Sequence, residues 1–99
     1  MNEEKKKMLL GELYDANYNK NLLEERIRAK DLCYKFNQLK PSQFKKRKNI
    51  LKTLIGKVKN NFYLESNFWC DYGYNIELGE NFYANHNLII LDANKVKFG

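Results

Sequence analysis

Large apolar residues recur at intervals of six in the C-terminal third of the chain. Ile76, Phe82 and Leu88 mark this spacing, and Gly79 and Asn81 lie between them at positions suited to a corner. A period of six matches neither the period of about 3.6 residues of a helix nor the alternation of a strand. It matches a left-handed parallel β-helix, in which each flat side of a triangular coil turns one residue inward per hexapeptide. We therefore predict that this segment forms such a coil.

The coil is also predicted to repeat. Residues 76–79 read Ile-Glu-Leu-Gly, and residues 96–99 read Val-Lys-Phe-Gly, twenty positions later. Three hexapeptide sides make a coil of about eighteen residues, so we expect two extra residues to bulge out in the segment 92–95. Because each turn of a solenoid needs neighbours to bury its core, we also expect this chain to be the front part of a longer structure.

The first sixty residues predict helices rather than strands. Apolar residues recur at helical spacing over 3–15, 22–39 and 41–59. Pro41 is expected to open the third helix, because proline is tolerated in a first turn. The residues expected to face inward from that helix are Phe44, Ile50, Leu51, Leu54, Ile55 and Val58. The predicted fold is α+β, with a helical cap over 1–60 that leads into the start of the left-handed β-helix over 61–99.

Composition indicates one small folded domain. The 99 residues are 43% hydrophobic and 14% aromatic, which supplies bulky core material. Cys33 and Cys70 lack the spacing of metal ligands, so we expect two buried, reduced thiols and no metal site. No apolar run has membrane-spanning length, and the N-terminus lacks the apolar core of a signal peptide. These features predict a cytoplasmic protein that does not bind a membrane.

The third predicted helix is strongly basic, and the whole chain carries a net charge of +6. Such a face can bind nucleic acid or another polyanion, or it can simply keep a surface helix in water. No Gly-rich phosphate loop or aromatic RNA-binding motif accompanies it. The solvated face is therefore favoured, and nucleic acid is not expected as a partner. The basic residues are Lys40, Lys45, Lys46, Arg47, Lys48, Lys52, Lys57 and Lys59.

Polar side chains gather near the expected corners of the coil. They are Asp71, Tyr83, Asn85 and Asp92. Carboxylates, a phenol and an amide suit the hydroxyl groups of a sugar, which need both donors and acceptors. Asparagine and aspartate are also common at turns for backbone reasons, so the residues alone leave both interpretations open. His86 has a side chain suited to a general base, but no nucleophile pattern surrounds it, and an ordinary coil residue is the favoured interpretation.

Five motifs follow one another along the chain. They are Gly-Glu-Leu-Tyr-Asp-Ala-Asn at 11–17, Glu-Arg-Ile-Arg-Ala-Lys at 25–30, Tyr-Lys-Phe-Asn at 34–37, Cys-Asp-Tyr-Gly-Tyr-Asn-Ile at 70–76 and Asn-Phe-Tyr-Ala-Asn at 81–85. In this order, and over essentially the whole chain, they resemble the opening of the maltose and galactoside O-acetyltransferases. Those enzymes belong to the hexapeptide-repeat acyltransferases. The maltose branch fits better, because residues 13–17 and 70–73 match its sequence motifs.

The resemblance implies transfer of an acetyl group from acetyl-CoA to a sugar hydroxyl. In the family, a histidine removes the hydroxyl proton while the oxygen attacks the thioester carbonyl, and nearby donors stabilise the oxyanion. The active sites lie between the subunits of a homotrimer. The acceptor implied here is maltose, glucose or a galactoside.

The resemblance also assigns roles to individual positions. Asp15 and Arg26 match residues of the helical cap that reach the acceptor sugar. Asp71 and Tyr83 match acceptor-site positions in the coil, and Asp92 matches another. Asn85 matches a position close to the transferred acetyl group.

The chain departs from the family pattern at the catalytic base. The family histidine comes downstream of the coil that begins at Val96, so it lies beyond Gly99, together with most of the CoA site. His86 stands where the family usually has phenylalanine. The resemblance therefore implies the N-terminal, acceptor-binding part of such an enzyme, inactive by itself. The alternative is a short non-catalytic paralogue that acts as an assembly or regulatory partner.

Overall fold

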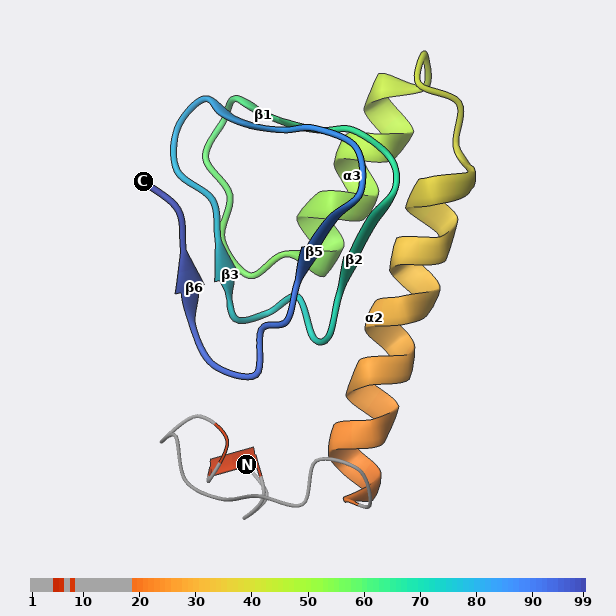
Figure 1. The fold of residues 1–99 in the computed structure, drawn as a ribbon. Helices are drawn as coiled ribbons and strands as arrows, with labels where there is room; N and C mark the ends of the chain where they lie inside the picture. The colour runs from red at the N-terminus through yellow and green to blue at the C-terminus, as the bar shows by residue number, and fades with distance from the viewer. Residues whose placement is uncertain (1–4, 7, 9–18) are drawn as a thin grey trace.

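The computed structural model describes residues 5, 6, 8 and 19–99. It shows a triangular coil of short strands, with two helices, α2 and α3, lying beside it (Figure 1). The helices precede the strands in the chain, in agreement with the predicted order of helical cap and coil. Most of the helix predicted over 3–15, and with it the predicted site residue Asp15, lies outside the described residues.

Helix α2 spans Lys20–Gln38 and confirms the helix predicted over 22–39. It begins earlier than predicted because the Asn19 side chain accepts a hydrogen bond from the Leu22 N–H (3.1 Å), which satisfies a free donor of the first turn. The helix packs against both α3 and strand β2 (Phe68–Cys70). Its buried side chains are Leu22, Ala29, Cys33 and Phe36.

Helix α3 spans Phe44–Leu54, which is shorter at both ends than the prediction of 41–59. The prediction that Pro41 opens it was wrong. The chain around Pro41 forms a separate turn instead, in which the Gln43 side chain accepts a hydrogen bond from the Lys40 N–H (2.8 Å). The helix therefore begins only after this turn has closed.

Helix α3 ends early because the chain after it joins the coil. Ile55 is already extended. The Lys57 N–H donates to the Ile76 carbonyl (3.1 Å), and the Lys57 carbonyl accepts from the Leu78 N–H (2.9 Å). These inter-segment hydrogen bonds replace the helical ones that the sequence pattern alone would continue.

Six short strands form the sides of the coil. They are β1 (Phe62–Leu64), β2 (Phe68–Cys70), β3 (Ile76–Glu77), β4 (Phe82–Ala84), β5 (Leu88–Ile90) and β6 (Val96–Lys97). They pair in parallel as β1 with β4, β2 with β5 and β3 with β6, so the three sheets make the three sides of a triangle (Figure 1). Ile76 lies opposite Val96, which confirms the predicted twenty-residue repeat.

The extra residues lie at one corner in both turns of the coil. The chain advances six positions from the start of β1 to that of β2, but eight from β2 to β3, and β4, β5 and β6 repeat these steps. The bulge expected at 92–95 therefore has a counterpart at 71–75 that the sequence analysis missed. We call the paired segments 71–75 and 91–95 the Asp92 corner.

The predicted six-residue spacing places one apolar side chain on each side of the coil. Ile76, Phe82 and Leu88 begin the consecutive strands β3, β4 and β5, and all three pack in one core. Ile76 is fully buried, whereas Phe82 and Leu88 are half-buried. The difference arises because Phe82 and Leu88 belong to the second turn, whose far edge is not covered by another described strand.

The two cysteines join the helical cap to the coil within the core. Cys33 of α2 and Cys70 of β2 are both buried, as predicted, with their Sγ atoms 3.9 Å apart. The contact with Cys33 and burial both raise the pKa of the Cys70 thiol, so Cys70 stays protonated. The pair behaves as apolar packing between α2 and β2.

Replacing Gly73 at the Asp92 corner should destabilise the fold. Gly73 has a φ of +86°, and an added Cβ would lie 2.3 Å from the Leu54 carbonyl oxygen. We expect Gly73→Ala to lower the free energy of unfolding by at least about 1–2 kcal/mol, as measured by urea unfolding. Gly99→Ala is the control, because a Cβ there meets no atom within 4 Å. Equal stability of the two variants would contradict this account.

Candidate functional site

Helix α2 meets the Asp92 corner through charged side chains. The Lys30 ammonium donates to the Cys70 carbonyl (2.7 Å) and to an Asp71 carboxylate oxygen (3.3 Å). The Arg26 guanidinium donates to the Tyr72 hydroxyl (3.0 Å). Because Arg26 and Lys30 are one helical turn apart, they present both cations on one face. The structure thus brings the predicted residues Arg26 and Asp71 to one junction and adds Lys30, which the sequence analysis did not single out.

A second set of contacts fixes the same junction. The Tyr74 hydroxyl donates to the Glu25 carboxylate (2.7 Å). Lys5 lies 2.9 Å from the other oxygen of that carboxylate and 4.4 Å from the centre of the Tyr74 ring. Burial and the hydrogen bond to Glu25 raise the pKa of Tyr74, so its phenol stays protonated and remains a donor. These contacts hold the N-terminal half of α2 against the corner.

Asp92 lies buried beneath the corner and shapes it. One carboxylate oxygen accepts the backbone N–H groups of Asp71 (3.1 Å) and Tyr72 (2.9 Å), and the other accepts those of Gly73 (2.8 Å) and Asn75 (3.3 Å). The Asn75 side chain donates back to the Asp92 carbonyl (2.7 Å). In this structure, Asp92 therefore positions the loop that carries Asp71, and its predicted contact with a ligand stays a prediction.

Tyr83 and Asn85 lie elsewhere on the coil. Tyr83 is on β4 with 60% of its surface exposed, and Asn85 is exposed at the corner between β4 and β5. Asp71 follows Cys70, which pairs with Ile90 at the other end of β5. Asn85 and Asp71 thus lie at opposite ends of the side formed by β2 and β5, and Tyr83 lies on the neighbouring side formed by β1 and β4. The structure therefore does not bring Asp71 together with Tyr83 and Asn85 within one chain.

His86 contacts the first turn of the coil from the corner between β4 and β5. Its Nδ1 atom lies 2.5 Å from the Ser66 carbonyl oxygen, and its Nε2 atom lies 3.7 Å from the Glu65 carboxylate. Both contacts connect the second turn of the coil to the first. They favour the interpretation of His86 as an ordinary coil residue.

Side chains of both helices cap the backbone of the first turn. The Asn37 amide donates to the Phe68 carbonyl (3.1 Å) and accepts from the Phe68 N–H (2.8 Å), as a neighbouring strand would. Arg47 donates to the Leu64 carbonyl (2.8 Å) and to the Ser66 hydroxyl (3.0 Å). Sequence reasoning missed both capping roles.

Arg47 does not belong to the solvated basic face in which the sequence analysis placed it. It is 3% exposed, and its guanidinium lies 4.6 Å from the centre of the Phe36 ring. The lysines Lys45, Lys46 and Lys52 on the same helix are exposed. The available signal was the single arginine in a run of lysines, because only arginine offers a planar fork that can bind two acceptors and stack on a ring.

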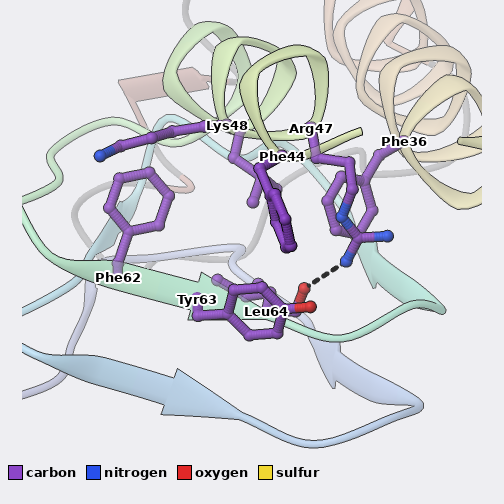
Figure 2. A pocket seen from close by; sticks show the side chains of 8 residues that line it. Phe36, Phe44, Arg47, Lys48, Phe62, Tyr63 and Leu64 are labelled. Atoms are coloured by element: carbon purple, nitrogen blue, oxygen red, sulfur yellow. Dashed lines mark hydrogen bonds between the residues drawn. The ribbon is translucent and has the colours of Figure 1, made fainter. Parts of the chain in front are cut away.

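Two adjoining hollows lie between α3 and the β1/β4 sheet. The first has a volume of about 160 Å³ and is lined by Phe36, Phe44, Arg47, Lys48, Leu51 and the strand β1 (Figure 2). The second, of about 320 Å³, extends from Lys48 and β1 to Tyr83. Phe44, which was predicted to face inward, is 65% exposed, because at the start of α3 it borders the first hollow rather than the coil core.

Residues 5, 6, 8 and 19–99 contain no group of His, Cys, Asp or Glu side chains placed to hold a metal ion. Within the same residues, neither helix is long and apolar enough to span a bilayer.

The family assignment rests on the helical cap. Residues 7–59, more than half of the chain, match the family model described as the maltose acetyltransferase hexapeptide capping motif. The chain belongs to this capping-motif family. Asn37 and Arg47 lie inside the matched range, and their hydrogen bonds to the coil show how the motif caps a hexapeptide structure.

Curated relatives of this capping-motif chain carry provisional acetyltransferase names. A Saccharomyces cerevisiae protein, provisionally named an acetyltransferase, is 49% identical over 86 residues, which are 87% of this chain and 44% of that protein. A similarly named protein of Staphylococcus haemolyticus is 47% identical over 90 residues, which are 91% of this chain and 47% of that protein. The chain spans about half the length of the curated relatives it matches.

Solved structures of the same kind superpose closely. A maltose O-acetyltransferase from Clostridium difficile is 45% identical, with a TM-score of 0.87 over 93% of this chain and 49% of its own. A galactoside acetyltransferase in complex with coenzyme A is 35% identical, with a TM-score of 0.88 over 98% of this chain and 48% of its own. These likenesses confirm the predicted resemblance to the maltose and galactoside acetyltransferases.

Asp92→Asn should loosen the corner. The substitution replaces an acceptor oxygen by an NH₂ group, so some of the four backbone N–H groups lose their acceptor. Leaving such buried donors unpaired costs about 1–3 kcal/mol each, and we expect a loss of at least that size in urea unfolding at neutral pH. Asp31→Asn, at an exposed position of α2, is the matched control. An unchanged unfolding midpoint for Asp92→Asn would show that the carboxylate does not support the loop.

Stability should also depend on pH through Asp92. Burial raises the pKa of its carboxyl, although the backbone hydrogen bonds act in the opposite direction. Because the pKa in the folded state is above the unfolded value, the pH-dependent part of the stability that this group contributes is fully present below the unfolded pKa. It is lost as pH rises through the folded pKa. The stability difference between the native chain and Asp92→Asn should therefore shrink as pH rises above about 4, and a constant difference across that range would contradict the prediction.

Proposed function

We propose that this chain supplies the acceptor-binding part of a sugar O-acetyltransferase that uses acetyl-CoA as acetyl donor. The names of its relatives support this proposal, because they include a maltose O-acetyltransferase and a galactoside acetyltransferase bound to coenzyme A. A hexapeptide-repeat acetyltransferase from Vibrio cholerae, 26% identical, was solved with acetyl coenzyme A. Complexes of two relatives with coenzyme A or its acetyl form support acetyl-CoA as the donor that we propose here.

The junction of α2 with the Asp92 corner carries the proposal. Arg26 and Lys30 bring cations, Asp71 a carboxylate and Tyr72 a phenol, so donors and acceptors lie side by side. Lys30 occupies only one oxygen of the Asp71 carboxylate, and the other accepts no hydrogen bond from the described residues. That free oxygen suits a sugar hydroxyl, which can donate to it.

In the proposed reaction, the sugar oxygen attacks the thioester carbonyl carbon of acetyl-CoA. The carbon–sulfur bond then breaks and CoA leaves as a thiolate, while a general base takes the hydroxyl proton and passes it to the thiolate sulfur. We do not assign that base to His86, because its Nδ1 atom already contacts the Ser66 carbonyl. We therefore expect these 99 residues alone to bind the sugar without transferring the acetyl group.

Assembly would complete the site. Asn85 lies at the opposite end of β5 from Asp71, and Tyr83 lies on the neighbouring side of the coil. One acceptor therefore contacts Asp71 together with these residues only if a second copy of the chain supplies one of the two groups. We propose the homotrimer and the left-handed winding implied by the family resemblance. In that arrangement, Asp71 of one copy and Asn85 of another flank the acceptor, with Asn85 nearer the acetyl group.

Asp71→Asn should weaken sugar binding. The change replaces the charged carboxylate by a neutral amide. A hydrogen bond to a charged group contributes about 1.5–3 kcal/mol of net stabilisation. We expect the dissociation constant for maltose or a galactoside to rise by about 10- to 100-fold, as measured by isothermal titration with the purified chain. Asp31→Asn should bind as the native chain does. Native affinity in Asp71→Asn would exclude this carboxylate from the acceptor site.

A further inference from the structure

The two hollows beside α3 form one continuous groove. They share Lys48, Phe62 and Tyr63 as lining residues. The groove runs from Phe44 at the start of α3 to Tyr83 on β4, and Figure 2 shows its α3 end, where Phe44, Phe62 and Tyr63 surround the opening. We call it the aromatic groove.

The groove exposes aromatic faces that the fold itself does not use. Phe44 is 65% exposed, and Tyr83 is 60% exposed. The Tyr83 ring stacks on Tyr63, with the ring centres 5.8 Å apart and the planes at 12°. The stack holds the Tyr83 ring in a fixed orientation, so it offers a flat apolar platform at the end of the groove opposite Phe44.

Polar groups that are mostly uncharged border this platform. The amide side chains of Asn61 and Asn81 line the Tyr83 end, and an amide both donates and accepts hydrogen bonds. The Lys48 ammonium donates to the Asn60 carbonyl (3.0 Å), which leaves two of its three N–H groups for another acceptor. No acidic side chain lines the groove among the described residues.

We infer that the aromatic groove binds a pyranose ring of a glycoside acceptor, at the end away from the acetylated sugar. A pyranose has an apolar face of C–H groups and a rim of hydroxyls, which match an aromatic platform bordered by amides and one ammonium. A phosphate-bearing ligand fits less well, because only one lysine lines the groove with hydrogen bonds to spare. Arg47 already donates to Leu64 and Ser66.

The groove adds a second sugar-binding place to the proposed acceptor site, and its role in the reaction rests on the proposed function. Tyr83, a predicted acceptor-site residue, lies at one end of the groove, so the groove extends the site by one ring toward Phe44. An acceptor that fills both places has at least two sugar rings. The groove therefore selects for a disaccharide or longer glycoside over a free monosaccharide.

The test follows backbone amide shifts of the isotopically labelled chain during titration with maltose, with glucose and with adenosine monophosphate. Maltose should shift the amides of Phe44, Phe62 and Tyr63 and should bind more tightly than glucose. Phe44→Ala should weaken maltose binding at these amides by about three- to tenfold, the size expected for one aromatic contact. Tyr34→Ala is the matched control, because Tyr34 is an aromatic residue of comparable exposure, 59% against 65% for Phe44, on α2 outside the groove.

The outcomes separate this inference from the proposed function. Maltose shifts confined to residues 71–75, with Phe44→Ala unchanged, would overturn the groove and leave the acceptor junction in place. Shifts at the groove that survive Asp71→Asn but weaken in Phe44→Ala support the groove even if the junction fails to bind sugar. Stronger groove shifts with adenosine monophosphate than with maltose, or none with maltose at high millimolar concentration, would overturn the sugar assignment.

Discussion

The first turn of a parallel coil has a backbone edge that no earlier strand covers, and the structure depends on how that edge is satisfied. Buried backbone groups without partners cost about 1–3 kcal/mol each. The helical cap meets this requirement with side chains placed where strand partners would be. Asn37 binds both backbone groups of Phe68, Arg47 binds the Leu64 carbonyl, and Lys30 binds the Cys70 carbonyl. On the third side the backbone of Lys57 pairs with β3 directly.

This requirement also places the candidate site. The same helix that caps β2 through Asn37 and Lys30 presents Arg26 one turn earlier, so the residues facing the Asp92 corner are fixed by the capping of the coil. The buried Asp92 carboxylate accepts hydrogen bonds from backbone N–H groups of the loop and so sets the position of Asp71. The hydrogen bonds from these N–H groups offset the free-energy cost of burying the carboxylate. Scaffold and site therefore share one set of contacts.

Much of the fold could be predicted from local pattern. The spacing of Ile76, Phe82 and Leu88 reflects one inward residue per side, so it survives in the sequence without knowledge of contacts. The boundaries of α3 could not be read in the same way. Lys57 has ample helix propensity, yet it pairs with Glu77 because a coil lies beside it in three dimensions. Propensity describes a segment alone, and here a long-range pairing outweighs it.

The candidate site residues likewise divide into those that a local motif reveals and those whose roles depend on long-range contacts. Arg26 and Asp71 were found through motif resemblance, whereas Lys30 and Asn37 look like ordinary helix-surface residues until their distant carbonyl partners are known. Arg47 was placed with the lysines because charge runs usually face water. Only the aromatic ring of Phe36 and the Leu64 carbonyl explain why it is buried. The resemblance alone does not show that Asn85 and Asp71 occupy opposite ends of β5, since that depends on the route of the chain around the triangle.

The capped edge gives the coil a polarity. Helical side chains occupy the edges of β1 and β2, and the Lys57 backbone occupies that of β3, whereas β4, β5 and β6 pair with described strands on one side alone. Evolution can therefore lengthen such a protein by duplicating twenty-residue units in one direction, without disturbing the junction at the other end. Under this arrangement the number of turns becomes a freely adjustable trait, while the helical cap is inherited as a fixed module.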